Sequence, residues 1–233
     1  QKHAPPRSCG NMHIPPNVMH NKRMNIRSLL IILFSSICIF GYSQTDEDYD
    51  IYSSVINYTI NNYDKGKSLP ASLLVKKRIE LKENVQDIQQ VIEDLYNDKE
   101  YRNWIVNYDT SSLRTIENET VKKCLKNLKQ SILDIPTIDC IQLDLKVPSG
   151  SISNFRFNRL FWFGVQNGWE KFYKRHPKSA GVFSVSKVVV IDDFACLYVE
   201  HEFGGLAASG DIMILNKTNS TWTVILSINV WVS

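Results

Sequence analysis

The sequence lacks the run of roughly 20 apolar residues that a bilayer-spanning helix requires. Its apolar block from Leu29 to Gly41 is only 13 residues long. Cysteine is scarce, with five residues in 233, and neither a CxxC pair nor a Cys/His spacing typical of zinc ligands occurs. These absences argue against a permanent membrane anchor and against a zinc site, and we expect neither a metal nor a cofactor.

The first 43 residues carry the features of a targeting segment. Residues 1–23 have no apolar periodicity, and we interpret them as an extension of gene-model or expression origin. From Met24 onward, Arg27 supplies a short positive segment, the apolar block follows, and Gly41-Tyr42-Ser43 places small residues three and one before a cleavage point. The pattern predicts a signal peptide over residues 24–43, and therefore an exported protein of the periplasm or the extracellular space.

Cleavage at this point would leave Gln44 as the first residue and would change the charge balance. The whole chain has 27 basic and 24 acidic residues, but five of the basic residues precede Gln44. The remainder has 22 basic against 24 acidic residues, a net charge of −2, and its Lys and Arg residues are scattered. A nucleic-acid partner is therefore not expected.

Three cysteines follow the predicted cleavage point, namely Cys124, Cys140 and Cys196. In an oxidising compartment an odd number leaves at least one thiol free or available for an intermolecular bond. We expect Cys196 to be a buried thiol, since it lies in an apolar strand. If an internal disulfide forms, Cys124 and Cys140 are the first pair to test.

Apolar spacing predicts a mainly helical first half of the domain. Apolar residues recur at helical spacing in several stretches, and a run rich in apolar and β-branched residues separates the first two. In order along the chain we predict a helix over Asp46–Tyr63, a strand over Leu69–Leu81, a helix over Glu83–Tyr96 and a short helix over Glu100–Asn107 anchored by Trp104.

A further helix is predicted to begin at a serine cap, Ser111 or Ser112, and to end at Asp134-Ile135-Pro136. Alternation of apolar and polar residues then predicts a half-buried strand over Ile141–Val147, and Pro148–Ser153 is expected to be a loop. The apolar face of the helix holds Val121, Cys124, Leu125, Leu128 and Ile132.

The segment Phe155–Tyr173 is dense in aromatic residues. Within it, Gly168–Tyr173 is predicted to be a short helix that packs its aromatic side chains inward and stops at His176-Pro177. The other aromatic residues are expected in the core, with a ligand-stacking surface as the alternative. They are Phe155, Phe157, Phe161, Trp162 and Phe163.

The C-terminal part predicts an antiparallel meander, because its β-rich runs are joined by short connections. In the last run, the even-numbered apolar residues from Trp222 to Val232 are expected to share one face. No repeat or linker divides the chain, so we predict one α+β domain over residues 44–233, with N-terminal helices and a meander of four or more strands packed on helices. The β-rich runs are Val182–Ile191, Phe194–Phe203, Asp211–Leu215 and Thr221–Val232.

Four groups of short motifs are distributed along this domain. They are Tyr52-Ser53-Ser54-Val55-Ile56, Trp169-Glu170-Lys171-Phe172-Tyr173 with Pro177, Ser179 and Gly181, the loop Gly204-Gly205-Leu206-Ala207-Ala208-Ser209-Gly210, and Trp222 with the terminal Trp231-Val232-Ser233. In these motifs the sequence resembles a group of uncharacterised exported proteins of Bacteroidetes-type bacteria. The motifs are packing and turn residues, so the resemblance implies export and the fold and implies no particular activity.

The loop Gly204–Gly210 is glycine-rich and lies between two predicted strands. A phosphate-binding loop needs Lys followed by Ser or Thr after its glycines and a helix to receive the phosphate, and this loop has neither. We expect a turn or bulge in which glycine supplies positive φ. As an alternative, Gly204, Gly205, Gly210 and the nearby His201 would form the rim of a binding site.

Acidic residues gather around the same loop, and Glu200, Glu202 and Asp211 are the candidates for chemistry. Side chains alternate along a strand, so Glu200 and Glu202 share one face and His201 lies on the other. A carboxyl group with a raised pKa in a concave pocket can act as a general acid.

Two functions therefore remain open. The favoured one is a non-catalytic exported module that binds a protein, peptide or envelope component through the sheet face or the loop at Gly204. The alternative is a small hydrolase that uses Glu200, Glu202 or Asp211 as acid and base. The hydrolase requires two of these carboxylates within about 10 Å across one pocket, whereas the binding module predicts them dispersed around a rim.

Overall fold

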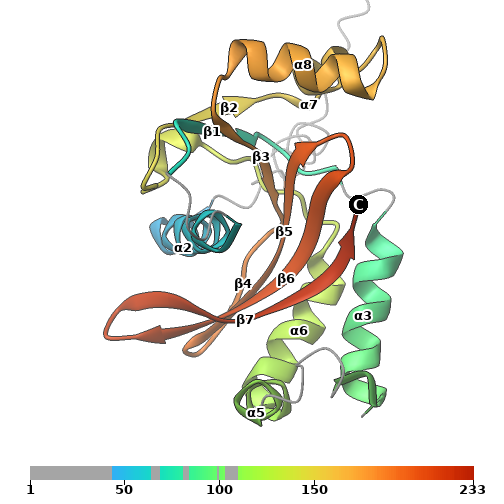
Figure 1. Cartoon of the computed structure of the whole chain (residues 1–233). Helices are drawn as coiled ribbons and strands as arrows, with labels where there is room; N and C mark the ends of the chain where they lie inside the picture. The colour runs from blue at the N-terminus through green and yellow to red at the C-terminus, as the bar shows by residue number, and fades with distance from the viewer. Residues whose placement is uncertain (1–43, 64–68, 81–83, 99, 103–109) are drawn as a thin grey trace, which may run out of the picture. The chain divides into compact units, whose positions relative to one another are not determined.

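The computed structural model describes residues 44–63, 69–80, 84–98, 100–102 and 110–233 (Figure 1). The predicted N-terminal extension and signal peptide lie outside the described residues, as do Trp104 and most of the short helix predicted after Glu100. Within the described part, no helix combines the length and the apolar character that crossing a membrane requires.

A mixed sheet, seven-stranded in the described part of the chain, confirms the predicted α+β class (Figure 1). Its main path runs in the order β2-β1-β3-β5-β6-β7, and β4 pairs with β5 beside that path. The strands are β1 (Ser72–Lys76), β2 (Ser149–Ile152), β3 (Ser179–Val185), β4 (Val189–Ile191), β5 (Phe194–Gly204), β6 (Ala207–Thr218) and β7 (Thr221–Val232).

Both kinds of strand pairing occur in this sheet. The strands β3, β5, β6 and β7 pair antiparallel in succession, which confirms the predicted meander. In contrast, β1 pairs in parallel with both β2 and β3, and the sequence did not predict these pairs. Parallel strands need a long crossover connection between them. Here β1 ends at Lys76 and β2 begins at Ser149, so the connection is long enough.

Three predicted strands have different bounds in the structure. The run expected over Asp211–Leu215 is longer, since β6 extends over Ala207–Thr218 and includes the second half of the predicted loop Gly204–Gly210. The strand expected over Leu69–Leu81 is limited to β1, and the run expected over Val182–Ile191 is divided between β3 and β4. The division occurs at Ser186, whose hydroxyl oxygen accepts from the backbone N–H of Tyr198 at 2.9 Å. The Ser186 side-chain oxygen takes the place of a backbone carbonyl as acceptor, so the regular backbone hydrogen bonding with β5 is interrupted at this residue.

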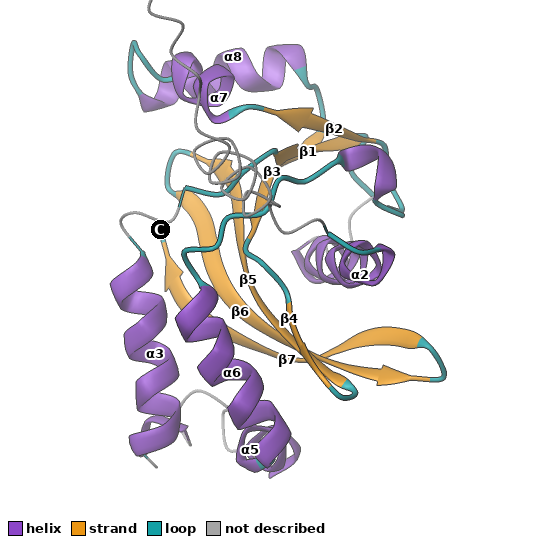
Figure 2. Cartoon of the chain, turned by 180° about the vertical axis from the view of Figure 1, so that it is seen from behind, coloured by secondary structure: helices purple, strands orange, loops and turns teal. Residues whose placement is uncertain are grey.

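Helix α2 (Asp46–Tyr63) covers one face of the sheet and has the predicted bounds (Figure 2). Its first turn is closed reciprocally, because the Thr45 N–H donates to Asp48 Oδ2 at 2.9 Å and the Asp48 N–H donates to Thr45 Oγ1 at 3.2 Å. We call the sheet side under this helix the α2 face. Side chains of the helix pack there against odd-numbered strand residues, which include Leu73, Val75, Phe183, Leu197, Val199 and Met213.

Helices α3 (Val85–Asn97), α5 (Thr110–Glu117) and α6 (Glu119–Ser131) cover the opposite side, which we call the α6 face (Figure 1). The first of them confirms the helix predicted over Glu83–Tyr96. The apolar faces of these helices pack against even-numbered strand residues, which include Cys196, Tyr198, Ile212, Ile214 and Ile228.

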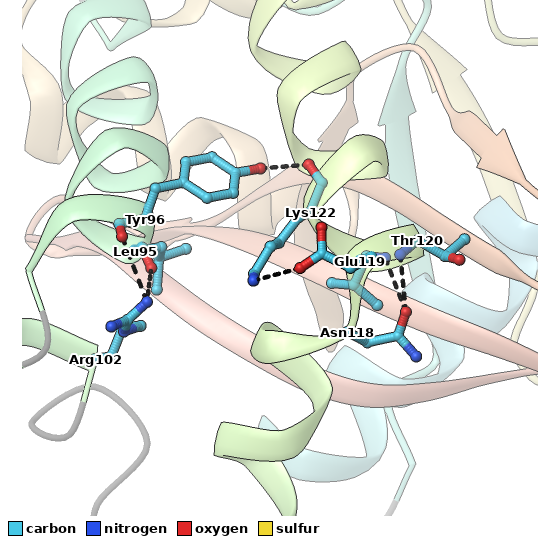
Figure 3. Close-up of polar contacts among 8 residues, drawn as sticks. Leu95, Tyr96, Arg102, Asn118, Glu119, Thr120 and Lys122 are labelled. Carbon is cyan, nitrogen blue, oxygen red and sulfur yellow. Dashed lines mark hydrogen bonds and ion pairs between the residues drawn. The ribbon is translucent and has the colours of Figure 1, made fainter.

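The serine cap predicted for the long helix is wrong. Ser112 lies inside α5, and the chain breaks before α6 at Asn118, whose side-chain oxygen accepts from the N–H groups of Thr120 at 2.8 Å and Val121 at 3.4 Å (Figure 3). An asparagine cap satisfies donors that would otherwise have no partner in the first turn. The same turn is tied to α3, because the phenol of Tyr96 donates to the carbonyl oxygen of Lys122 (Figure 3).

Helices α7 (Asn154–Leu160) and α8 (Val165–Arg175) pack on the α6 face at the β1 and β3 end of the sheet (Figure 2). The predicted helix Gly168–Tyr173 is the central part of α8, and it ends at His176 as expected. Phe157 of α7 and Trp169 and Phe172 of α8 are buried against Leu74 and Val182. Two separate groups of helices therefore cover the same face of the sheet.

The strand predicted over Ile141–Val147 is wrong. Residues Cys140–Gln142 form a short 3₁₀ turn, η1, and the side chain of Ile141 is 92% exposed. Side chains of α2 take the hydrogen bonds that a neighbouring strand would make, since Ser53 Oγ accepts from the Asp144 N–H at 2.9 Å and Asn57 Oδ1 accepts from the Lys146 N–H at 3.0 Å. The loop predicted over Pro148–Ser153 contains strand β2 instead.

The prediction that the even-numbered residues of the last strand share one face is also wrong. Register shifts between β6 and β7 occur on both sides of the segment Asp211–Ile214. Each shift inserts one extra residue into β7 and reverses its alternation. Trp222 therefore packs on the α2 face, whereas Leu226 and Ile228 pack on the α6 face.

Cys124, Cys140 and Cys196 are all free and buried. Cys140 lies in the cluster on the α2 face, whereas Cys124 and Cys196 belong to the cluster on the α6 face. The sheet separates Cys124 from Cys140, so the disulfide suggested as the first pair to test is not formed. Burial of the Cys196 thiol is confirmed, and it lies in the same buried cluster as Cys124.

Candidate functional site

A cavity of about 590 Å³ lies on the α6 face. Residues of α7 and α8, the residue before α3 and the ends of β1, β5 and β7 line it, so it lies where the two groups of helices leave the sheet uncovered. We call it the carboxylate cavity. Its lining includes the polar residues Lys76, Asn84, Glu200 and Glu202, the aromatic residues Phe157, Phe161, Trp169 and Trp231, and Gly204 and Gly205.

A chain of hydrogen bonds holds Glu200 at the inner surface of this cavity. Its Oε1 accepts from Asn84 Nδ2 at 3.1 Å and from the phenol of Tyr198 at 3.1 Å. The phenol oxygen in turn accepts from the indole N–H of Trp231 at 2.7 Å. Three strand residues and the residue before α3 are thereby fixed relative to one another.

Burial changes the acid–base properties of this group. The side chain of Glu200 is almost completely buried, and this desolvation raises the pKa of its carboxyl above the ordinary value of 4.5. The hydrogen bonds from Asn84 and Tyr198 and the charge of Lys76 oppose the shift. Desolvation outweighs them, so Glu200 binds a proton more tightly than an exposed glutamate does.

The second carboxylate of the cavity is paired with a lysine. Lys76 Nζ lies 2.5 Å from Glu202 Oε1, and the lysine side chain is only 9% exposed. The same ammonium group lies 4.6 Å from the ring centre of Phe157, at the distance of a cation–π contact. Removing the two charges from water offsets much of their mutual attraction, so a pair at this position is weak evidence for stability.

Aromatic rings from α7 and α8 line part of the cavity. Phe161 and Trp169 lie 5.5 Å apart in an edge-on arrangement, and Phe157 and Trp169 lie 6.0 Å apart in a similar one. Such edge-to-face contacts keep the rings in fixed positions. The cavity therefore presents an apolar aromatic surface next to the carboxylates of Glu80, Glu200 and Glu202, the ammonium group of Lys76 and the amides of Asn84 and Asn158.

The glycines predicted to form a loop lie in two places: Gly204 and Gly205 lie at the carboxylate cavity, and Gly210 lies within strand β6. Gly204 and Gly205 line the carboxylate cavity, and the chain turns between β5 and β6 next to them. Among the described glycines only Gly164 and Gly181 have positive φ, so the expectation that glycine supplies positive φ in this loop is wrong. The predicted bulge is present as a register shift between Glu202 and Gly204.

Gly210 is required for close packing. A Cβ atom at this position would overlap both Tyr198 Oη and Trp231 Nε1, the two atoms that form the hydrogen bond described above. The absence of a side chain at Gly210 lets the indole reach the phenol. The hydrogen bond between Trp231 and Tyr198 therefore depends on the absence of a side chain at Gly210 in the neighbouring strand β6.

His201 and Asp211 lie on the α2 face, away from the carboxylate cavity, and line a second cavity of about 510 Å³. The His201 ring is buried, stacks on Phe183 with ring centres 4.2 Å apart, and donates from Nε2 to the carbonyl oxygen of Ala180 at 2.7 Å. Asp211 accepts hydrogen bonds from Ser209 Oγ at 3.0 Å and Asn229 Nδ2 at 3.1 Å, and burial raises the pKa of its carboxyl.

The structure thus brings together two of the three candidate carboxylates. Glu200 and Glu202 share one cavity, and the sheet separates them from Asp211. Sequence reasoning missed Lys76, Asn84, Tyr198 and Trp231. Only Lys76 has a local signal, since it is a charged residue at the end of the apolar run Leu73-Leu74-Val75. In the described ranges, no group of three His, Cys, Asp or Glu side chains is arranged to hold a metal ion.

At a significant level, the chain matches no family model, no curated protein and no solved structure.

Proposed function

We propose that this protein is an exported, non-catalytic binding module whose carboxylate cavity receives a polar group of a peptide or of another envelope component. The observation that carries the proposal is the buried Glu200, held by Asn84 and Tyr198 beside an aromatic surface. Export is proposed from the signal-peptide pattern before Gln44 and from the resemblance to exported proteins.

The lining of the cavity defines the chemistry of the ligand. Glu200 and Glu202 offer acceptor oxygens, whereas Lys76 and Asn84 carry donors. The rings of Phe161 and Trp169 offer apolar surface next to these groups. A hydroxyl- or amide-bearing group with one apolar side suits this combination, as a sugar ring or a peptide segment does.

The existing interactions of the carboxylates favour binding over turnover. Glu202 is paired with Lys76, and Oε1 of Glu200 already accepts two hydrogen bonds. A ligand can use these fixed groups without any rearrangement, and such preorganised sites lose little entropy on binding.

Nuclear magnetic resonance of the two strand β7 tryptophans tests the proposal. The purified protein is titrated with muropeptides, oligosaccharides and short peptides of bacterial envelopes, and the indole N–H signals are followed. We expect at least one fragment class to shift the signal of Trp231, which lines the cavity, and to leave that of Trp222 on the α2 face unchanged.

Two matched substitutions locate the binding. Glu200→Gln keeps the size of the side chain and removes its charge, and it should weaken the shift of Trp231. Asp211→Asn makes the equivalent change on the other face and should leave it unchanged. The proposal fails if no fragment shifts Trp231, or if both tryptophans shift together in every case.

The hydrolase remains a second candidate because one observation favours it. Glu200, whose pKa is raised by burial, shares its cavity with Glu202, and a general acid beside a second carboxylate is the arrangement of glycoside hydrolases. Asp211 takes no part, since it lies on the opposite face. Turnover of an oligosaccharide that Glu200→Gln abolishes without loss of binding would favour this candidate over the binding module.

A further inference from the structure

Exposed aromatic side chains are concentrated at one corner of the fold. Among the described residues, the exposed aromatic side chains are Phe155 (66%), Trp162 (67%) and Phe163 (74%), and Val165 (55%) is also exposed beside them in the sequence. All four belong to α7, α8 and their connection, which lie together at the top of the view in Figure 1. We call Asn154–His176 the α7–α8 corner. Single exposed apolar residues are ordinary, but a group of this kind indicates a contact surface.

The aromatic run predicted from the sequence is therefore divided. Phe157 is buried against the sheet and Phe161 is partly buried, as expected for the core, whereas Phe155, Trp162 and Phe163 point outward. The inward and outward rings come from the same short stretch, so burial of one group presents the other to solvent.

Positive charge is concentrated at the same corner. The α7–α8 corner has five basic residues and one acidic residue, a net charge of +4, although the chain from Gln44 onward has a net charge of −2. None of these basic residues forms an ion pair with a described acidic residue in the structure. The five are Arg156, Arg159, Lys171, Lys174 and Arg175.

Cations and aromatic rings together line a cavity of about 790 Å³ in this corner. The guanidinium of Arg159 lies 5.9 Å from the ring centre of Trp162, and Lys171 Nζ lies 5.0 Å from that of Phe163. Arg156, Arg175 and His176 also line this cavity, and none of the described carboxylates does. We call it the basic cavity.

We propose that the α7–α8 corner is a peripheral docking surface for an anionic phospholipid membrane. The basic cavity receives lipid phosphate, and Trp162 and Phe163 enter the headgroup region. Exposed Trp and Phe rings beside Arg and Lys that have no described carboxylate partner are the composition of membrane-interface segments. The amphipathic indole and the apolar Phe rings enter the headgroup boundary, and the cations meet the negative surface. Protein interfaces are also enriched in aromatic residues and Arg, so an acidic protein partner is the alternative that the experiment below separates from a membrane.

This inference does not depend on the proposed function, because the basic cavity and the carboxylate cavity have different linings. It does predict how the protein is oriented on the membrane. A protein that docks through this corner would hold the carboxylate cavity close to the membrane surface, since α7 and α8 contribute residues to both cavities.

Vesicle sedimentation tests the proposal. The purified protein is mixed with phosphatidylcholine vesicles, with or without phosphatidylglycerol, at low and at high salt. We expect binding to the anionic vesicles only, weakened by salt. Arg159→Gln with Lys171→Gln should lower the partition coefficient about twenty-fivefold, at about fivefold for each cation, and Trp162→Ala with Phe163→Ala should lower it about tenfold.

Matched controls separate this corner from unspecific attraction. Lys123→Gln with Lys126→Gln removes the same charge from the exposed side of α6, and Ile141→Ala removes an exposed apolar side chain elsewhere. Both controls should bind as the natural protein does. The variants differ from it only at these positions, so membrane affinity of any other segment cancels, and circular dichroism shows that each variant is folded.

Three results would overturn the proposal. The first is no binding to anionic vesicles, and the second is that the corner variants bind no more weakly than the controls. The third is that polyglutamate binds the corner while anionic vesicles do not compete for it, which would indicate an acidic protein partner instead.

Discussion

The indole N–H of Trp231 donates to the phenol oxygen of Tyr198 at 2.7 Å, and this bond joins the last strand to the centre of the sheet. Tyr198 donates to Glu200 in turn, so the position of the buried carboxyl depends on a residue near the C-terminal end of β7. Gly210 lies between them on β6, opposite both Glu200 and Trp231.

Gly210→Ala is expected to destabilise the fold by about 2 kcal/mol, because the added methyl group overlaps the two hydrogen-bonded atoms and overpacks a filled space. Urea unfolding measures the change. As a control, Gly205→Ala places its Cβ 3.2 Å from Val165 Cγ1, a tight but adjustable contact, and should cost less. Equal losses in the two variants would contradict the role assigned to Gly210.

The protonation of Glu200 predicts a pH dependence of stability. Desolvation raises its pKa above 4.5 in the folded protein, so the folded state binds the proton more tightly than the unfolded chain. Its stabilising contribution is complete below pH 4.5 and is lost as the pH rises through the raised pKa. The unfolding free energy of the natural protein minus that of Glu200→Gln should therefore fall with rising pH.

Urea unfolding at a series of pH values measures this difference. Asp211→Asn should give the same direction starting from 3.8, since burial also raises the pKa of Asp211. A difference that increases with pH for Glu200→Gln would show that its carboxyl is stabilised in the ionised form.

A double-mutant cycle determines the coupling of Lys76 and Glu202. Lys76→Met leaves Glu202 without its cation and should cost about 2 kcal/mol, because a partly buried carboxylate loses a charged hydrogen bond. The double variant Lys76→Met with Glu202→Leu should be more stable than the sum of the two single changes predicts. Additive losses would mean that the pair contributes no interaction energy.

Removal of the α6 cap should lower stability without affecting the cavity. Asn118→Ala deletes the acceptor of two N–H groups and is expected to cost about 1 kcal/mol (Figure 3). Asn127→Ala, in the interior of α6, is the control and should have a smaller effect. Thermal unfolding compares them.

The buried thiols should be unreactive in the folded protein. Burial raises the pKa of Cys140 to about 11, so at pH 8 only about one thiol in a thousand is ionised at this position. Burial also raises the pKa of Cys196 well above its ordinary value. Labelling with a thiol reagent, read by peptide mass spectrometry, should modify both residues only after unfolding in urea. Rapid labelling of Cys140 in the native protein would contradict its burial.

Periodicity predicted the elements whose packing is local. The helical spacing of apolar residues predicted the bounds of α2, Asp46–Tyr63. Strand alternation correctly placed Glu200 and Glu202 on one face and His201 on the other. In contrast, Ile141–Val147 alternates like a strand but has side chains of α2 as its hydrogen-bond partners. Such partners are distant in sequence, and the pattern contains no information about them.

The same distinction applies to the site. The carboxylates could be found because they are neighbours on one strand. Their partners come from elsewhere, since Lys76 is 126 residues before Glu202 and Asn84 is 116 residues before Glu200. Trp231 reaches the α6 face only because the bulge near Val230 changes the alternation of β7, and a bulge is set by the neighbouring strand as much as by its own sequence.

The parallel pairing of β1 has a consequence for the order in which the chain can fold. Ser72–Lys76 has β2 and β3 as its neighbours, and both are synthesised much later. Until the chain has been made as far as Ile152, the apolar residues Leu73, Leu74 and Val75 have no strand to pair with, and their second neighbour, β3, is complete only at Val185. Long-range pairing of this kind slows folding and leaves apolar residues and an unpaired strand edge exposed in the meantime. Newly made chains of this protein should therefore depend on a chaperone that prevents aggregation more than an antiparallel meander alone would.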